Sequence, residues 1–148
     1  MAKFVNKSCM DQKLIYKAGV VPFRKTGNGK KLSDIEVLTV SSRKYPGEWV
    51  FPVGTVEENE SFANAALREC LEESGYVVKL EEPVKEIDSF LLDSGEISFK
   101  FIFFQGFVTG ENRIWEDDRE RRWCGVDEVV QLVARPFRHV AETAVKNI

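Results

Sequence analysis

The sequence lacks the features of several large classes of protein. In its 148 residues, no apolar run approaches the ~20 residues that a membrane-spanning helix needs. Lys3 interrupts the stretch in which a secretory leader would carry its apolar core. We therefore expect a protein without a membrane partner that is located in the cytoplasm, with the nucleus as a second compartment.

Cysteine and histidine are scarce. The three cysteines, Cys9, Cys70 and Cys124, lie far apart and are odd in number, which fits neither a disulfide framework nor a paired-cysteine zinc site. We interpret them as reduced thiols. His139 is the single histidine, so a metal cluster built from several histidines is excluded. Any chemistry must therefore depend mainly on carboxylates.

The chain also lacks the positive charge of a duplex DNA-binding protein. Its formal net charge is −3 and its pI is about 5.4. This average hides an asymmetry, because residues 1–50 carry an excess of positive charge and residues 51–148 an excess of negative charge. The basic first third indicates an anionic partner. The length, with 43% hydrophobic residues, fits one domain over residues 1–148 with a buried core.

The hydrophobic pattern predicts strands on both sides of one well-marked helix. The helix is expected from Ser61 to Ser74, with Ser61 as its N-cap and Gly75 at its C-terminal end. The run 97–108 is rich in aromatic and β-branched residues and predicts a long central strand. Further strands are predicted at 14–23, 35–40, 49–51, 77–80 and 84–92, with a polar connection over 111–122.

The remaining elements complete an α/β (α+β) pattern. Pro22 would place the first strand at a sheet edge, because proline has no backbone N–H to donate. Trp123 is expected to open a short strand. Helices are expected from Asp127 to Val133 and from Pro136 to Lys146. This order predicts a mixed β-sheet packed against helices.

Three glutamates lie on one side of the predicted helix. Glu69, Glu72 and Glu73 are spaced i, i+3 and i+4, so their carboxylates are neighbours that repel one another. A bound Mg²⁺ or Mn²⁺ turns this repulsion into a favourable interaction, because these ions take oxygen ligands from carboxylates, water and phosphates. Gly54 lies just before the helix, where its carbonyl oxygen can reach the same ion. The alternative is a solvated charged face, which is the usual explanation of such glutamates.

The full spacing decides between these alternatives. From Gly54 to Tyr76 the chain is Gly-x5-Glu-x7-Arg-Glu-Cys-x-Glu-Glu-x-Gly-Tyr. If each of the seven fixed residues has a frequency of roughly 7%, the probability of a chance match is about 10⁻⁸ per starting position. The segment resembles the Nudix box at every fixed position, with Cys70 and Tyr76 at its two bulky apolar positions. The resemblance implies a Nudix fold, a mixed β-sheet between helices. It also implies Mg²⁺- or Mn²⁺-dependent hydrolysis of a diphosphate linked to another group.

The resemblance also implies roles for the acidic residues. Glu69 and Glu73 match the positions of metal ligands in the Nudix box, and the resemblance implies the Gly54 carbonyl as a third ligand. Glu72 matches a position that is either a ligand or the general base that activates water. The sequence leaves base and ligand unassigned among these acids.

Arg68 and Glu60 complete the candidate catalytic set. Arg68 lies one turn before Glu72 and eight residues after Glu60, so it can pair with an acid and hold it in place. The resemblance implies that Arg68 orients the glutamates. It implies that Glu60 is its partner or an acid behind the metal ligands.

The likeness extends from about Lys17 to Glu142, where the chain is similar to the diadenosine and diphosphoinositol polyphosphate phosphohydrolases. In that branch, bases on the first strand and in the loop before the tryptophan hold the substrate phosphates. The implied substrate is therefore a small anionic polyphosphate. The matching candidates for substrate binding are Lys17, Ser41, Ser42, Arg43, Lys44, Gly54 and Thr55.

Two departures keep other substrates open. Thr55 stands where the branch has a glycine-rich run, and the loop 93–96 is acidic where inositol phosphate-binding relatives are basic. The second departure favours a dinucleoside polyphosphate over a diphosphoinositol polyphosphate. The alternatives are ADP-ribose, a nucleoside triphosphate, a nucleotide sugar or capped RNA, and apart from capped RNA we expect no nucleic acid as a partner. A Nudix-fold binding protein without catalysis is a further alternative.

Aromatic residues have two interpretations. The phenylalanines of the long strand, Phe99, Phe101, Phe103, Phe104 and Phe107, are expected in the core. Tyr16, Tyr45 and Trp115 are candidates for stacking on an adenine ring, or for packing at the rim. Likewise, Arg119, Arg121 and Arg122 either supply charge to the substrate or belong to a solvated loop.

Overall fold

The computed structural model describes residues 13–148, so Cys9 and Lys3, the residue that argues against a secretory leader, lie outside the described residues. Within 13–148, no helix is both long and apolar enough to cross a bilayer. The strands are β1 (Lys13–Lys25), β2 (Ile35–Ser41), β3 (Trp49–Val50), β4 (Val53–Thr55), β5 (Tyr76–Leu80), β6 (Asp88–Ser94), β7 (Ile97–Glu111) and β8 (Arg121–Gly125). The helices are α2 (Phe62–Ser74), α3 (Val129–Leu132) and α4 (Arg138–Lys146), with 3-10 turns at Leu32–Asp34 and Arg135–Phe137.

The strands form one mixed sheet in the order β3-β2-β1-β7-β5. Its centre is a parallel pair in which Lys13–Phe23 of β1 lies beside Ile97–Phe107 of β7. The other ladders are antiparallel: β4 pairs with β1, β6 with β7, and β8 with β2. The predicted long central strand is confirmed, because β7 pairs with β1, β5 and β6.

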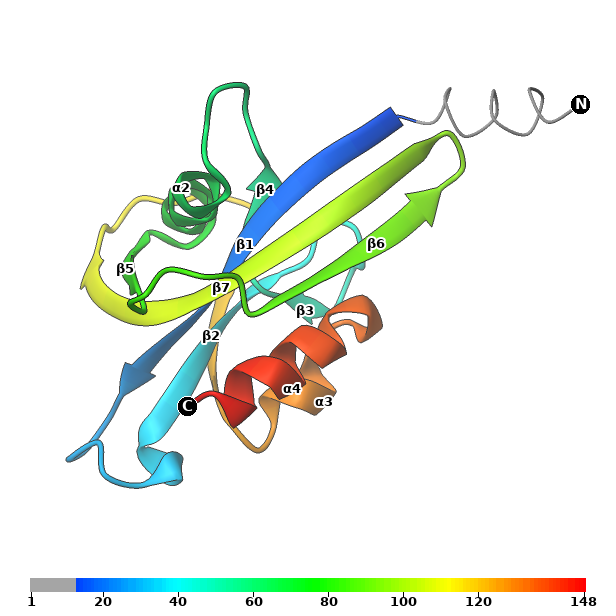
Figure 1. Ribbon diagram of the computed structural model, residues 1–148. Coiled ribbons are helices and arrows are strands. Elements are labelled where there is room, and N and C mark those ends of the chain that lie inside the picture. The colour runs from blue at the N-terminus through cyan, green and yellow to red at the C-terminus, as the bar shows by residue number, and fades with distance from the viewer. Residues whose placement is uncertain (1–12) are drawn as a thin grey trace, which may run out of the picture.

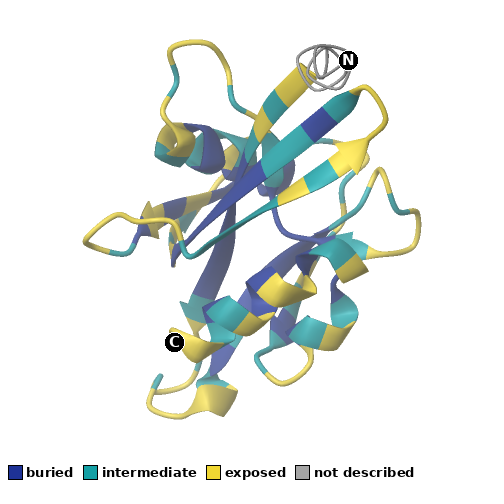
Figure 2. Cartoon of the chain, turned by 45° about the vertical axis from the view of Figure 1, so that its right-hand side comes forward, coloured by how far each residue is buried: buried dark blue, intermediate teal, exposed yellow. Residues whose placement is uncertain are grey.

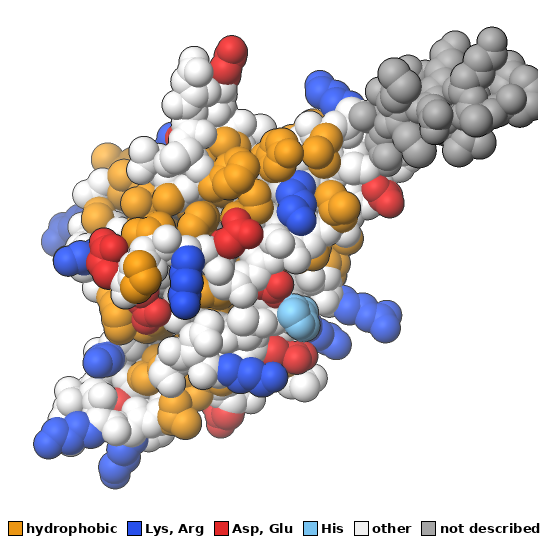
Figure 3. All heavy atoms as spheres, viewed as in Figure 1, with side chains coloured by type: hydrophobic (Ala, Val, Ile, Leu, Met, Phe, Trp, Pro, Cys, Tyr) orange, Lys and Arg blue, Asp and Glu red, His pale blue; other side chains and the backbone are white. Residues whose placement is uncertain are grey.

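The sheet lies between two helical layers, as predicted (Figure 1). Helix α2 covers one face, where Ala66 and Cys70 pack with Leu38 of β2. Helices α3 and α4 cover the other face, where Val129 and Val140 pack in a second cluster of buried residues. Figure 2 shows the resulting buried band along the centre of the sheet. In Figure 3, lysine and arginine side chains are dispersed over the visible face among acidic and neutral ones.

The predicted ends of α2 are confirmed. The Ser61 Oγ accepts a hydrogen bond from the Asn64 N–H at 3.0 Å, which satisfies one of the free N–H groups of the first turn. Gly75 has φ of 76°, in the left-handed region, and donates its N–H to the Leu71 carbonyl. These two residues fix which part of the chain forms the helix that carries the glutamates.

The prediction that Pro22 marks an edge strand is wrong. Pro22 lies in β1, at the centre of the sheet, opposite Gly106 of β7. Along its other edge, β1 pairs with β4 through residue Gly19 and with β2 from residue Phe23. Proline is therefore accommodated where β1 changes partner, and a missing N–H disrupts neither of those two ladders.

Several element boundaries also differ from the prediction. Strand β4 was not predicted, because Pro52 indicates the end of a strand, yet Val53–Thr55 continues beside β1. Strand β6 begins at Asp88 instead of at 84. Trp123 is the middle of β8 and does not open it. The residue before α3 is Glu128, not Asp127, and its side chain makes no capping hydrogen bond.

The phenylalanines of β7 follow the alternation of a strand. Phe101 and Phe103 are buried on the α3–α4 side, and Phe104 on the α2 side. Phe99 is only partly buried, and Phe107 is 37% exposed. The core prediction therefore holds for the middle of the strand.

The two described cysteines are free and buried. Burial raises the pKa of the Cys70 and Cys124 thiols to about 12 in each case. Both therefore stay protonated at neutral pH and behave as small apolar residues of the core.

Candidate active site

The three glutamates of α2 lie in three different environments. The Glu72 side chain is 49% exposed, the Glu69 side chain 15% and the Glu73 side chain 2%. Exposure does not follow their order along the helix, because Glu72 and Glu73 share the last turn of α2 but point in different directions, Glu72 toward Arg68 and Glu73 toward Arg119. Identical carboxyl groups therefore differ in their access to water.

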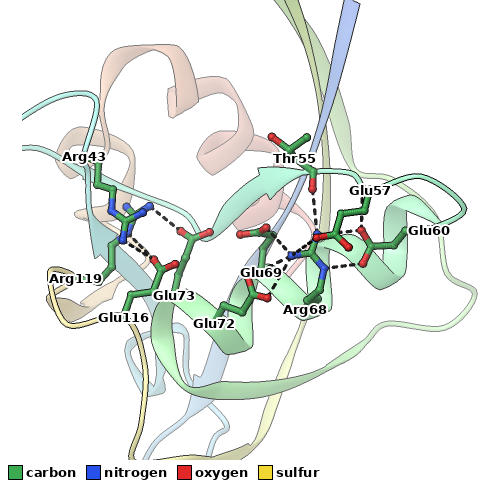
Figure 4. A network of polar contacts seen from close by, with 10 residues as sticks. All are labelled: Arg43, Thr55, Glu57, Glu60, Arg68, Glu69, Glu72, Glu73, Glu116 and Arg119. Carbon is green, nitrogen blue, oxygen red and sulfur yellow. Dashed lines mark hydrogen bonds and ion pairs between the residues drawn. The ribbon is translucent and has the colours of Figure 1, made fainter.

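Arg68 is the centre of the exposed half of the site (Figure 4). Its Nε and Nη2 donate to the two oxygens of Glu60 at 2.7 and 2.9 Å, so the predicted pair is present. Its Nη1 donates to Glu69 at 2.7 Å and lies 3.2 Å from Glu72, and Nη2 donates to the Thr55 carbonyl at 3.0 Å. The guanidinium holds the pKa of Glu60 at about 2. Arg68 therefore fixes two of the three glutamates.

Gly54 lies in β4 directly against Glu69. A Cβ on Gly54 would be 2.1 Å from the Glu69 Cδ, so only glycine allows the backbone to come this close. This contact brings the Gly54 backbone and the Glu69 carboxylate together, as the metal-binding prediction requires.

Glu73 is a buried carboxyl group with an unsatisfied oxygen. Its Oε1 has no hydrogen-bond partner, and Arg119 Nη2 lies 3.4 Å away. Burial, with Glu69 as a neighbour of like charge, raises the pKa of Glu73 to about 9. A buried oxygen without a partner is costly, and a divalent cation would satisfy it. The chemistry of Glu69, Glu73 and the Gly54 backbone therefore fits a hard metal ion.

The three glutamates do not form a ready-made cage. Within residues 13–148, no three acidic, histidine or cysteine side chains are grouped closely enough to enclose a metal ion. Figure 4 shows Glu72 directed toward Arg68, while Glu73 faces Arg119. An ion that takes only one or two carboxylates, with water and phosphate as its other ligands, suits this arrangement.

A pocket of about 200 Å³ brings Glu73 together with the predicted phosphate-binding residues. Lys17 comes from β1, and Ser42, Arg43 and Lys44 come from the loop after β2. The Nζ atoms of Lys17 and Lys44 lie 5.5 and 5.8 Å from the centre of the Phe99 ring. Residues distant in sequence thus place three cations around one opening.

Three predicted substrate residues, Ser41, Gly54 and Thr55, do not line this pocket. Ser41 directs its Oγ to the connection instead, where it accepts the Glu120 N–H at 2.8 Å. Thr55 is exposed on β4, and its carbonyl is held by Arg68.

Aromatic side chains form the wall of the pocket. Of the three stacking candidates, only Tyr45 lines it. Tyr16 stacks on Phe62 with ring centres 5.4 Å apart, and the Trp115 ring packs against the Arg121 guanidinium. Phe99 was expected in the core but is part of this wall. Its place near the start of β7, beside the pocket, has no signal in the sequence.

The predicted connection over 111–122 ends at Glu120, because Arg121 and Arg122 belong to β8, and Arg119, Arg121 and Arg122 have three different roles. Arg119 lines the pocket and donates to the Ser41 carbonyl at 2.6 Å, so it is close to the candidate substrate site. Arg121 lies 3.7 Å from the Trp115 ring centre and donates to the Ser74 carbonyl at the end of α2. Arg122 is half-exposed and packs over Trp49. The charge-supplying interpretation fits the position of Arg119 alone.

Arg43 is paired with two acids of the connection that the sequence did not single out. Its Nε and Nη2 donate to the two oxygens of Asp118, both at 2.6 Å, and Nη2 lies 3.1 Å from Glu116. These contacts raise the pKa of Arg43 and lower that of Asp118. Arg43 is therefore a cation of the pocket that is already bound to a bidentate anion.

Comparison with known proteins gives a family and a fold. The NUDIX domain model matches residues 15–145. Nudix hydrolase 17, mitochondrial, of Arabidopsis thaliana is 39% identical over 114 residues, which is 74% of this chain and 62% of that protein. Diphosphoinositol polyphosphate phosphohydrolase 2 of Rattus norvegicus is 31% identical over 102 residues, which is 66% of this chain and 54% of that protein.

These matches leave part of each relative uncovered, because the matched region spans 62% and 54% of these two proteins. Among solved structures, the crystal structure of the C. elegans Ap4A hydrolase superposes with a TM-score of 0.70. It covers 90% of this chain and 98% of that chain at 18% identity, so the likeness establishes the fold alone.

Proposed function

Because the chain belongs to the Nudix domain family, we propose that it is a hydrolase dependent on a divalent metal ion. Its proposed substrate is a dinucleoside polyphosphate of the diadenosine penta- or hexaphosphate type, a diphosphoinositol polyphosphate, or both. The bond cleaved is a phosphoanhydride. The observation that carries the proposal is the pocket that Glu73 of α2 shares with Lys17, Arg43 and Lys44.

The metal ion is assigned to Glu69, Glu73 and the Gly54 carbonyl. When bound, Mg²⁺ or Mn²⁺ neutralises phosphate charge and lowers the pKa of a bound water. Arg68 holds the carboxylates of Glu69 and Glu72 in place while the substrate binds. Glu72 is the most exposed of the three acids, and we assign to it the proton of the attacking water.

The pocket supports the dinucleoside polyphosphate as the preferred substrate. The cations at its rim suit a chain of phosphates, and guanidinium groups suit bidentate phosphate contacts. The Tyr45 and Phe99 rings offer an apolar surface to a nucleobase, which a fully anionic inositol polyphosphate does not need. The acidic turn 93–96 follows Leu92 of the pocket wall and disfavours the more highly charged ligand. We place the reaction in the cytoplasm.

A hydrolysis panel tests the proposal. The purified chain is assayed with Mg²⁺ and with Mn²⁺ on diadenosine penta- and hexaphosphate, diphosphoinositol pentakisphosphate, ADP-ribose, nucleoside triphosphates and capped RNA. We expect the highest kcat/KM on the diadenosine compounds and complete loss of activity in EDTA. Preference for ADP-ribose or capped RNA would contradict the substrate assignment, and no metal-dependent hydrolysis would contradict the enzymatic one.

A further inference from the structure

Arg43 differs from the other cations of the pocket in its partners. Lys17 and Lys44 contact the Phe99 ring, whereas Arg43 makes two hydrogen bonds of 2.6 Å to the carboxylate of Asp118. In a bidentate pair, the guanidinium presents two parallel N–H groups to two oxygens. A phosphate group would use the same two donors. Asp118 and a substrate phosphate are therefore alternative occupants of one position.

Asp118 is held near Arg43 by its neighbours in the connection. Arg119 donates to the Ser41 carbonyl at 2.6 Å, the Glu120 N–H donates to the Ser41 Oγ at 2.8 Å, and the Ser41 N–H donates to the Glu120 carbonyl at 2.9 Å. Ser41 is two residues before Arg43, so the segments that carry the two partners are tied together. A tethered carboxylate has a high effective concentration at its partner, and it returns whenever the phosphate leaves.

The connection is also anchored to the helix that carries the glutamates. The Glu116 N–H donates to the Glu72 carbonyl at 3.0 Å, and Glu116 Oε1 lies 3.1 Å from Arg43 Nη2. Both acids that contact Arg43 therefore come from a segment fixed at its two ends. Figure 4 shows Arg43, Glu116 and Arg119 grouped beside Glu73.

We propose that Asp118 is a specificity-determining residue that competes with substrate phosphate for Arg43. This inference rests on the proposed function of the pocket. A short phosphate chain must exchange one anionic partner of Arg43 for another, so it gains little there. A longer chain also reaches Lys17 and Lys44, and these contacts offset the displacement of Asp118. The competition therefore makes the site selective for long phosphate chains.

The test measures phosphate binding without catalysis. Pyrophosphate and tripolyphosphate are titrated by calorimetry, in EDTA, into the wild type, D118N and D117N. We expect D118N to bind pyrophosphate about three- to fivefold more tightly, as for the loss of one exposed ion pair, and tripolyphosphate with a smaller gain. D117N removes the same charge from the neighbouring exposed acid and should leave both affinities unchanged.

A double-mutant cycle and kinetics separate competition at Arg43 from other effects. In an R43Q background, D118N should no longer change affinity. In turnover, D118N should lower KM for the shortest substrate at unchanged kcat, and D118E should restore the wild-type KM. Equal gains in D118N and D117N, or a gain that persists with R43Q, would overturn the inference.

The same titrations, together with the hydrolysis panel, distinguish failure of this inference from failure of the proposed function. Binding that is lost in R43Q but unaffected by D118N would overturn the competition alone. No phosphate binding in the wild type or in D118N would remove the phosphate-binding role of Arg43 and overturn the inference, whereas the proposed function fails only if the hydrolysis panel shows no metal-dependent activity.

Discussion

Replacing Gly54 with alanine tests whether the close approach of the β4 backbone to Glu69 matters for the reaction. The added Cβ would lie 2.1 Å from the Glu69 Cδ and 2.2 and 2.5 Å from its oxygens, where ordinary contacts begin at 3.4 Å. The carboxylate must therefore move by about 1 Å, which weakens its 2.7 Å hydrogen bond from Arg68. A misplacement of about 1 Å in an active site costs about 100-fold in rate. We expect G54A to lose about that factor in kcat/KM.

Stability should respond differently from activity. The Glu69 carboxylate is the free end of a flexible side chain, so its displacement should lower the Tm by less than about 2 °C. The assay compares Mg²⁺-dependent hydrolysis and thermal unfolding of G54A with those of G110A. In that control the new Cβ lies 3.7 Å from Val77, an ordinary contact. A wild-type kcat/KM in G54A would show that the close approach of Gly54 to Glu69 does not matter for the reaction. A large decrease in Tm would mean that the loss of activity comes from disturbed packing.

Three further predictions concern single side chains. Glu73→Gln should lower kcat by orders of magnitude with an unchanged circular dichroism spectrum, because it weakens the metal site; near-normal turnover would contradict the ligand assignment. Arg43→Ala should raise KM much more for a substrate with six phosphates than for ADP-ribose, and equal increases would mean that Arg43 does not contact the phosphate chain. Glu60→Gln should be destabilising above pH 5 and progressively less so as the pH falls from 4.5 toward 2. The reason is that the folded pKa of about 2 lies below the ordinary 4.5, so the stabilisation by Glu60 is lost as the carboxylate is protonated. Urea unfolding of both proteins between pH 3 and 7 measures this, and a difference independent of pH would contradict the ion-pair explanation.

The sequence predicted the parts of the site that depend on local spacing. The ends of α2, the pairing of Arg68 with Glu60 and the family itself follow from residues within 23 positions of one another, and all three are confirmed. Helix capping and i, i+4 geometry act over such distances without help from the rest of the chain.

The parts that were missed depend on segments far apart in the chain. Asp118 lies 75 positions from Arg43, and only the folded sheet brings the connection beside the loop after β2. The exposure of Phe99 to the pocket depends equally on where β1 and the loop lie. Pro22 was placed at an edge because its missing N–H is a local property, whereas the change of partner strand that accommodates it is a property of the whole sheet.

The parallel pairing of β1 with β7 has a consequence for how the protein folds. Each residue of β1 from Lys13 to Phe23 pairs with one 84 positions later, as Lys13 does with Ile97. Closing so large a loop costs chain entropy before its contacts form, so such a ladder slows folding. Lys17 is part of this ladder and Glu73 is in the loop that it closes. We expect substitutions along β1 and β7 to slow refolding, and the pocket to be completed only when this ladder has formed.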